Sequence, residues 1–222
     1  MLIIFDCDGV LVDSEPLALR LMAEQLSAAG FEASAEDLLA RFAGFTDDEV
    51  LRIVAREAGK PLPEGFETAY TDALEERLVK VEAVPGAHEM LDLLEDPRCV
   101  CSNSPASRLK ITLGATGLYD RFRPYVFSAR DVGKPKPAPD IYLHAAQQLE
   151  TAPGDSVVIE DSVAGVTAAV AAGVRVIGFT GTAHGRSGLG DALTEAGAET
   201  VVHRLADVAP VIEAFRHWRD PG

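Results

Sequence analysis

Near its beginning the chain reads LIIFDCDGVLVDS over residues 2–14. Four apolar residues, Leu2 to Phe5, lead directly into two aspartates, Asp6 and Asp8, and then a glycine. A short, continuous, β-prone apolar run is typical of a strand that is buried on both faces of a parallel sheet. We therefore expect a central strand over residues 2–5, with two carboxylates held close together at its carboxyl end.

Five further apolar runs of this kind follow along the chain: Cys99 to Cys101, Tyr125 to Phe127, Val157 to Ile159, Val174 to Phe179 and Thr200 to Val202. Helical patterns lie between most of them, over residues 88–94, 107–112, 140–149 and 163–172. Strands that alternate with helices predict right-handed βαβ units. The expected fold class is therefore α/β, with a Rossmann-like core built on a parallel sheet.

Residues 15–84 interrupt this alternation, because they carry helical patterns and no convincing strand. A simple crossover unit needs only about 30 residues, so this stretch is too long to be one. We expect an inserted α-helical cap over 15–84, with helices within 17–30, 34–44, 46–59 and 66–80, and a core made of 1–14 and 85–222. Both connections to the cap lie beside the first strand, so we expect a ligand cleft between cap and core.

The composition excludes several classes of partner. The chain has 222 residues, with 20 Lys and Arg against 35 Asp and Glu, which gives a formal charge of −15. Such an acidic chain is not expected to bind nucleic acid or an anionic membrane over a broad surface. It also has no apolar run near the ~18 residues of a membrane span, and its three cysteines suit a reducing compartment. We expect a cytoplasmic protein, monomeric or weakly dimeric, that holds any anionic ligand locally.

A second acidic pair, Glu160 and Asp161, ends the apolar run of residues 157–159. Neighbouring strand ends would gather these acids with Asp6 and Asp8, and so much negative charge needs a cation. Hard oxygen ligands favour Mg²⁺. Two further segments supply what these acids lack. SNSP at 102–105, before a helix, could bind phosphate oxygens, and the proline-fixed loop GKPKPAPD at 133–140 carries two lysines that could offset nearby negative charge.

In this order, four segments resemble the motifs of the haloacid dehalogenase superfamily: DCDGVLVDSE at 6–15, the strand-end Ser102, KPAPD at 136–140 and IEDSVAG at 159–165. The resemblance covers essentially the whole chain. It is to the branch with a helical cap after the first strand, similar to β-phosphoglucomutase-like enzymes and to sugar and 6-phosphogluconate phosphatases. It implies a Mg²⁺-dependent phosphatase that hydrolyses a small phosphorylated metabolite, a sugar or sugar-acid phosphate.

The resemblance also implies a role for each matched residue. Asp6 would be the nucleophile that forms an aspartyl-phosphate, and Asp8 the general acid and base. Ser102 and a lysine would bind the transferring phosphoryl oxygens, and Lys136 fits the Lys-Pro-x-Pro-Asp pattern better than Lys134. The implied metal ligands are Asp6, Asp8 through its main-chain carbonyl, Glu160 and Asp161, and the implied substrate-binding residues are Asn103 and, in the cap loop, Arg41, Gly44 and Phe45.

Other functions stay open at this point. A β-phosphoglucomutase-type mutase is one, although Ala18 and Asp47 stand where that subgroup has a histidine and a phosphate-binding arginine. A non-catalytic phospho-acceptor module is another, which the cap and Asp8 disfavour. Dehalogenation is disfavoured because it needs neither an acid at Asp8 nor a metal cluster.

Several other residues have structural interpretations. We expect Cys7, Cys99 and Cys101 to be buried core residues rather than zinc ligands, because partner ligands are missing nearby. The acids at 47–49 suit the first turn of a helix. The glycine-containing segment 181–185 lacks the spacing of a phosphate loop, and we expect a surface loop there.

Overall fold

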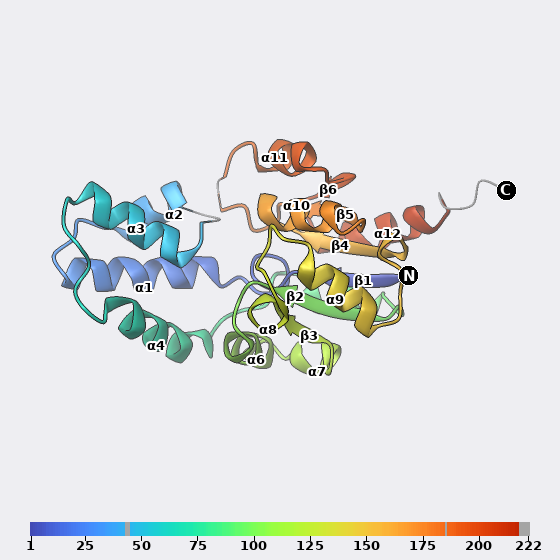
Figure 1. The fold of residues 1–222 in the computed structure, drawn as a ribbon, viewed down its shortest axis with the longest axis horizontal. Coiled ribbons are helices and arrows are strands. Elements are labelled where there is room, and N and C mark those ends of the chain that lie inside the picture. Colours follow the sequence, from blue (N-terminus) through green and yellow to red (C-terminus); the bar gives the residue numbers. More distant parts are fainter. Residues whose placement is uncertain (43–44, 185, 218–222) are drawn as a thin grey trace.

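The computed structural model describes residues 1–42, 45–184 and 186–217. Two parts are visible along the long axis of the molecule (Figure 1). One is a sheet with helices on both faces, and the other is the group of helices α1 to α4, which lies beyond the carboxyl ends of the strands. We predict a core made of residues 1–14 and 85–222 and a cap made of residues 15–84. The order of the elements along the chain agrees with this division, and its exact boundaries remain a prediction.

The core is a six-stranded parallel sheet in the order β3-β2-β1-β4-β5-β6. Its central strand is β1, which pairs with β2 on one side and β4 on the other. All six predicted strands are confirmed, each within one residue of its expected ends. Their bounds are β1 Leu2–Phe5, β2 Arg98–Ser102, β3 Val126–Ser128, β4 Ser156–Glu160, β5 Arg175–Phe179 and β6 Thr200–Val202.

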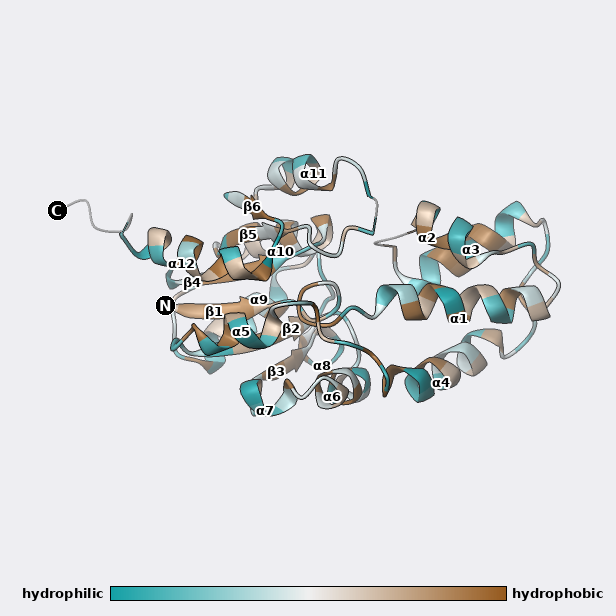
Figure 2. Cartoon of the chain, turned by 180° about the vertical axis from the view of Figure 1, so that it is seen from behind, coloured by the Kyte–Doolittle hydropathy of each residue, from teal (hydrophilic) through white to brown (hydrophobic). Residues whose placement is uncertain are grey.

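Both faces of the sheet are buried, which explains the continuous apolar runs. Ile3 and Phe5 belong to one hydrophobic cluster, whereas Leu2 and Ile4 belong to another, because successive side chains of a strand point to opposite faces. Figure 2 shows the apolar character of β1 against the mixed colouring of the helices around it. These two layers of packing fix the position and direction of β1, and therefore of Asp6 after it.

Helices cover the two faces. The helices α5, α6 and α12 contribute to the cluster of Ile3, whereas α9, α10 and α11 contribute to that of Ile4. The four helices predicted between the strands are present as α5, α6, α9 and α10, and α7, α8, α11 and α12 were not predicted. The bounds are α5 Ala87–Asp92, α6 Ala106–Ala115, α7 Tyr119–Phe122, α8 Ala129–Val132, α9 Asp140–Gln148, α10 Val163–Ala171, α11 Leu189–Ala196 and α12 Val208–His217, with short 3₁₀ turns at Pro153–Asp155 and Leu205–Asp207.

The predicted cap helices are α1 Glu15–Ala28, α2 Ala35–Phe42, α3 Asp47–Glu57 and α4 Phe66–Leu78. Helix α3 begins with a capping box, in which the Thr46 hydroxyl accepts from the Glu49 amide and the Glu49 carboxylate accepts from the Thr46 amide. This arrangement satisfies two otherwise unpaired amides and places Asp47 in the first turn. The acids at 47–49 therefore occupy the first turn that we expected.

Two short connections join the cap to the core, and they are hydrogen-bonded to each other. The Asp13 amide donates to the Glu82 carbonyl at 3.1 Å, and the Val84 amide donates to the Leu11 carbonyl at 3.0 Å. Between these bonds Val12 forms an antiparallel bridge with Ala83. The chain therefore enters and leaves the cap side by side, just beyond the carboxyl end of β1.

The predicted core position of the cysteines is confirmed. The thiols of Cys7, Cys99 and Cys101 are free and buried. Among the described residues, no helix combines the length and apolar composition that crossing a bilayer requires.

Candidate active site

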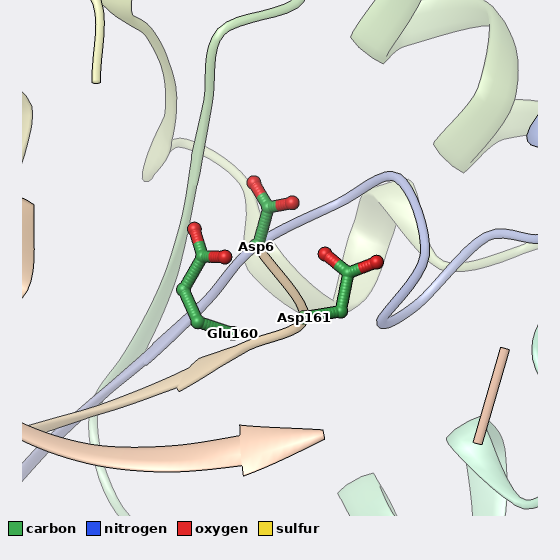
Figure 3. A group of neighbouring side chains, drawn as sticks. All are labelled: Asp6, Glu160 and Asp161. Atoms are coloured by element: carbon green, nitrogen blue, oxygen red, sulfur yellow. The ribbon is translucent and has the colours of Figure 1, made fainter. Parts of the chain in front are cut away.

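Three carboxylates meet at the carboxyl edge of the sheet (Figure 3). Asp6 follows β1, whereas Glu160 ends β4 and Asp161 follows it. The two strands are neighbours in register, with Phe5 opposite Ile159. Each of the three residues offers an oxygen atom within 4.8 Å of the others. The strand pairing thus brings together acids that lie far apart in the sequence.

Two glycines make room for these carboxylates. Gly9 has a φ of +84°, and a Cβ atom on it would lie 2.1 Å from Oδ2 of Asp161. A Cβ atom on Gly165, in α10, would lie 1.8 Å from Oε1 of Glu160. Both motifs therefore need glycine for space, and Gly9 also needs it for its left-handed backbone.

Lys136 is the cation at the centre of the site. Its Nζ atom donates to Oδ1 of Asp6 at 2.8 Å, to Oε1 of Glu160 at 2.6 Å and to the Cys101 carbonyl at 2.8 Å. Its side chain is only 3% exposed. Lys134, two residues earlier, is exposed. Of the two lysines in this loop, the structure brings Lys136 to the carboxylates.

Glu160 is fixed by hydrogen bonds on both of its oxygens. Oε1 accepts from Lys136 and from the Tyr142 hydroxyl, the latter at 2.9 Å. Oε2 accepts from the amide and the hydroxyl of Ser162, at 3.1 and 2.9 Å. Ser162 in turn caps α10 by accepting from the Gly165 amide. Glu160 therefore connects the strand end, the next helix and the buried lysine.

The protonation behaviour of the site reflects its crowded charges. Burial, opposed by Lys136 and reinforced by Glu160, raises the pKa of Asp6 from 3.8 to about 7. Burial and the neighbouring Glu160 raise the pKa of Asp161 well above its usual range. Burial alone would lower the pKa of Lys136, but the charges of Asp6 and Glu160 raise it. The carboxylates thus outnumber the cations inside the site, and a bound metal cation would supply the missing positive charge.

Asp8 lies on the cap side of Asp6. The Ser14 hydroxyl donates to its Oδ1 at 2.5 Å, and the Ser104 hydroxyl donates to its Oδ2 at 2.7 Å. Arg108 Nη2 lies 4.0 Å from the same Oδ1. The Asp8 side chain is thus oriented by one residue before α1 and one after β2, and remains 27% exposed.

The segment after β2 supports the lysine. Asn103 forms two hydrogen bonds to the main chain of Lys136: its Oδ1 accepts from the amide at 2.9 Å, and its Nδ2 donates to the carbonyl at 3.3 Å. Ser102 is buried, and its hydroxyl accepts from the Ser104 amide at 3.0 Å. Ser102 ends the strand next to β1, whereas Asn103 holds the loop that carries Lys136.

The structure does not bring Arg41 to this cluster. Its guanidinium is bound by Asp37 at 3.0 Å and Glu57 at 2.6 Å, within a hollow of the cap that these residues line. Phe45 is 48% exposed and packs edge-to-face on Phe42. Gly44 lies outside the described residues.

Sequence reasoning missed several residues that surround the carboxylates. They are Arg108, which lies beside Asp8, Tyr142, which donates a hydrogen bond to Glu160, and Arg186, whose Nη2 lies 3.5 Å from Asp161. The expectation of a surface loop at 181–185 was wrong for Thr182, which is buried and donates to the Gly9 carbonyl at 2.5 Å. None of these residues belongs to a motif, so only the spatial arrangement identifies them.

Comparison with known proteins gives matches over most of the chain. Residues 1–173 match the family model described as haloacid dehalogenase-like hydrolase. The 6-phosphogluconate phosphatase of Escherichia coli (strain K12) is 31% identical over 83% of this chain and 84% of its own length. The β-phosphoglucomutase of Bacillus subtilis (strain 168) is 28% identical over 93% and 90%. A solved haloacid dehalogenase-like protein of unknown function from Agrobacterium tumefaciens str. C58 has 45% identity and a TM-score of 0.87, covering 97% of this chain and 98% of that one.

Proposed function

The chain belongs to the haloacid dehalogenase-like hydrolases, and from this membership and the site geometry we propose that it is a Mg²⁺-dependent phosphatase of a small phosphorylated metabolite, a sugar or sugar-acid phosphate. The observation that carries the proposal is the buried contact of Asp6 with Lys136 beside Asp161, with Asp8 two residues along the same loop and close enough for its charge to act on Asp6. In this arrangement Asp6 can serve as the carboxylate nucleophile and Lys136 as the cation that binds the phosphoryl oxygens. Asp8 is the second acid, and its side chain remains partly exposed.

In the proposed reaction Asp6 attacks phosphorus, and the bond from phosphorus to the ester oxygen breaks. Asp8 donates its proton to the leaving alkoxide, so that an alcohol departs and an aspartyl-phosphate remains on Asp6. Asp8 then removes a proton from water, which attacks phosphorus and releases inorganic phosphate together with free Asp6. Lys136 binds Oδ1 of Asp6, and this contact limits rotation of the carboxylate during both steps.

The donor set fits a hard divalent cation. Asp6 and Asp161 supply carboxylate oxygens close to each other, and burial together with the neighbouring Glu160 raises the pKa of both groups. We assign Mg²⁺ to these two side chains and to the main-chain carbonyl of Asp8. Glu160 was expected among the metal ligands, but four hydrogen bonds already occupy its oxygens, and we assign it instead to positioning Lys136. The cation would neutralise charge on the phosphoryl group and lower the pKa of Asp6.

Hydrolysis is favoured over mutase chemistry by the surroundings of Asp47. The Arg108 guanidinium lies 3.4 Å from Asp47 of the cap and 4.0 Å from Asp8 of the core. Asp47 already balances the charge of Arg108, so a second phosphate would find no free cation at this position. Family membership also weighs against a non-catalytic phospho-acceptor. Two further parts of the proposal rest on the sequence. A metabolite, rather than nucleic acid or a membrane, is the expected partner because the charge is −15, and a cytoplasmic location is expected because three cysteines suit a reducing compartment.

The proposal is tested with p-nitrophenyl phosphate and Mg²⁺. We expect turnover by the unaltered protein, and a phosphoenzyme that is detected after rapid acid quench with labelled substrate. Asp6→Asn should abolish both, whereas Asp120→Asn, which changes an exposed carboxylate on α7, should affect neither. A phosphoenzyme that survives in Asp6→Asn would place the nucleophile elsewhere.

A further inference from the structure

Arg108 lies where the cap meets the core, and the catalytic steps proposed above do not use it. Its Nη1 donates to Oδ2 of Asp47 at 3.4 Å, and its Nη2 lies 4.0 Å from Oδ1 of Asp8. Asp47 belongs to α3 of the cap, whereas Arg108 belongs to α6 of the core. The guanidinium thus stands between a cap carboxylate and the proposed general acid.

The pairing of Arg108 is incomplete. A guanidinium carries five N–H donors, and the single hydrogen bond to Asp47 is long. Among the residues that the structure describes, Nε of Arg108 is the only buried side-chain nitrogen or oxygen without a hydrogen-bond partner. Unsatisfied buried donors are rare, and they call for a specific explanation such as a ligand or water that completes them. The side chain is therefore held in place without being satisfied by Asp47.

Acceptors are available at the same position. The Tyr70 hydroxyl of α4 donates to Oδ1 of Asp47 at 3.2 Å and so limits the rotation of this carboxylate, whose Oδ2 accepts from Arg108. The side chains of Arg108, Asp8 and Asp47 remain 17%, 27% and 31% exposed. Donors on Arg108 and acceptors on Asp47 can therefore contact the same small group next to Asp8.

The charges decide which kind of group fits. One guanidinium lies between two carboxylates. Asp47 alone balances the charge of Arg108 while Asp8 carries the proton that it donates, and once Asp8 is ionised the local charge is negative, so neither state attracts a further anion. A hydroxyl group carries no charge, accepts a hydrogen bond through its oxygen and donates one through its hydrogen. An aliphatic group would leave the buried Nε of Arg108 without an acceptor, which costs free energy in a partly buried site.

We propose that Arg108 and Asp47 form a specificity pair for a hydroxyl on the carbon next to the ester carbon of the leaving alcohol. The pair would select phosphates of polyols over simple alkyl phosphates, and over phosphates with a carboxylate at that position. This inference rests on the proposed function, because Asp8 marks the leaving-group side of the site only if it protonates the leaving oxygen.

The test uses three two-carbon substrates that differ in one group: 2-hydroxyethyl phosphate, ethyl phosphate and 2-phosphoglycolate. For each, kcat/KM is measured with Mg²⁺ on the full chain, on Arg108→Met and on Asp47→Asn, with Arg204→Gln as a control for the loss of an exposed arginine. We expect the unaltered protein to prefer 2-hydroxyethyl over ethyl phosphate by about 10- to 100-fold, the range for hydrogen bonds to charged groups. Arg108→Met should reduce this ratio to within about threefold of unity, and Arg204→Gln should leave it unchanged.

Asp47→Asn should lower the same ratio and raise the relative use of 2-phosphoglycolate, because one of the two repelling carboxylates is removed. The inference is overturned if Arg108→Met slows 2-hydroxyethyl and ethyl phosphate equally, since the residue would then act only through Asp8 or the fold. It is also overturned if the unaltered protein prefers 2-phosphoglycolate and loses that preference in Arg108→Met, because the pair would then bind anions. Failure of the proposed function gives a different result, namely no phosphate release from any substrate, p-nitrophenyl phosphate included.

Discussion

Replacing Lys136 with methionine should damage both folding and turnover, because methionine fills similar space and carries no charge. The change removes three hydrogen bonds of 2.6–2.8 Å from a side chain that is 3% exposed. It leaves Asp6 and Glu160 buried without their cation, and removing one partner of a buried ion pair costs about 3–5 kcal/mol. Domains of this size are stable by only about 5–15 kcal/mol, so the loss is a large fraction of the total.

Urea unfolding measures the first effect and p-nitrophenyl phosphate hydrolysis the second. We expect a stability loss of about 3–5 kcal/mol and a fall in kcat of about 10²- to 10³-fold, as for other groups that stabilise transition-state charge. Lys134→Met is the matched control, since this neighbour in the same loop is exposed and should cost little in either assay. Equal losses in the two variants would refute the assignment of Lys136.

A second variant separates charge from folding. In Lys136→Met combined with Glu160→Gln, one positive and one negative charge are lost together, so the free energy of unfolding should rise above that of Lys136→Met. Turnover should stay low, because the cation that binds the phosphoryl oxygens is still missing. If turnover recovered together with stability, Lys136 would be only a structural partner of Glu160.

Three further outcomes are expected. Excess chelator should abolish phosphatase turnover and added Mg²⁺ should restore it, whereas full activity in chelator would exclude the proposed metal. Without metal, folding raises the pKa of Asp6 from 3.8 to about 7. Between these two pH values the folded protein therefore binds a proton on Asp6 that the unfolded chain does not bind. The free energy of unfolding in chelator should then fall as the pH rises through this range, by at most about 1.4 kcal/mol per pH unit. Urea unfolding at pH 5 and pH 7.5 checks this, and greater stability at pH 7.5 would contradict it. β-Glucose 1-phosphate with a bisphosphate activator should give free phosphate rather than glucose 6-phosphate, and faster formation of the sugar phosphate would identify a mutase.

The sequence predicted those features that repeat along the chain or sit in local motifs. The strands of a parallel sheet are short apolar runs because both faces are buried, and the positions of Ile3 and Ile4 in opposite clusters show this directly. The sequence also predicted that the acidic pair Asp6 and Asp8 lies near the pair Glu160 and Asp161, because the carboxyl ends of parallel strands lie at the same edge of the sheet. Local pattern therefore sufficed for the sheet and the carboxylates.

Contacts across the boundary between cap and core could not be predicted in this way. Asp47 was interpreted correctly as a first-turn acid, but its partner Arg108 lies on another helix and looks like an ordinary polar residue of α6. Arg41 seemed suited to an anion because of its place in the cap loop, but Asp37 and Glu57 surround it. Such pairings depend on how the helices pack, and local sequence patterns do not reveal that packing.

The paired connections at Val12 and Ala83 make the whole cap, in topological terms, the turn of one long hairpin. Closing that hairpin near its base costs conformational entropy that grows only slowly with the length of the insertion, so the core tolerates caps of different size at this point. If the cap moved relative to the core, the chain would bend at this paired strip. The bond from Ser14 to Asp8 lies beside the strip and would be kept, whereas the contact of Asp47 with Arg108, which joins α3 to α6, would be broken.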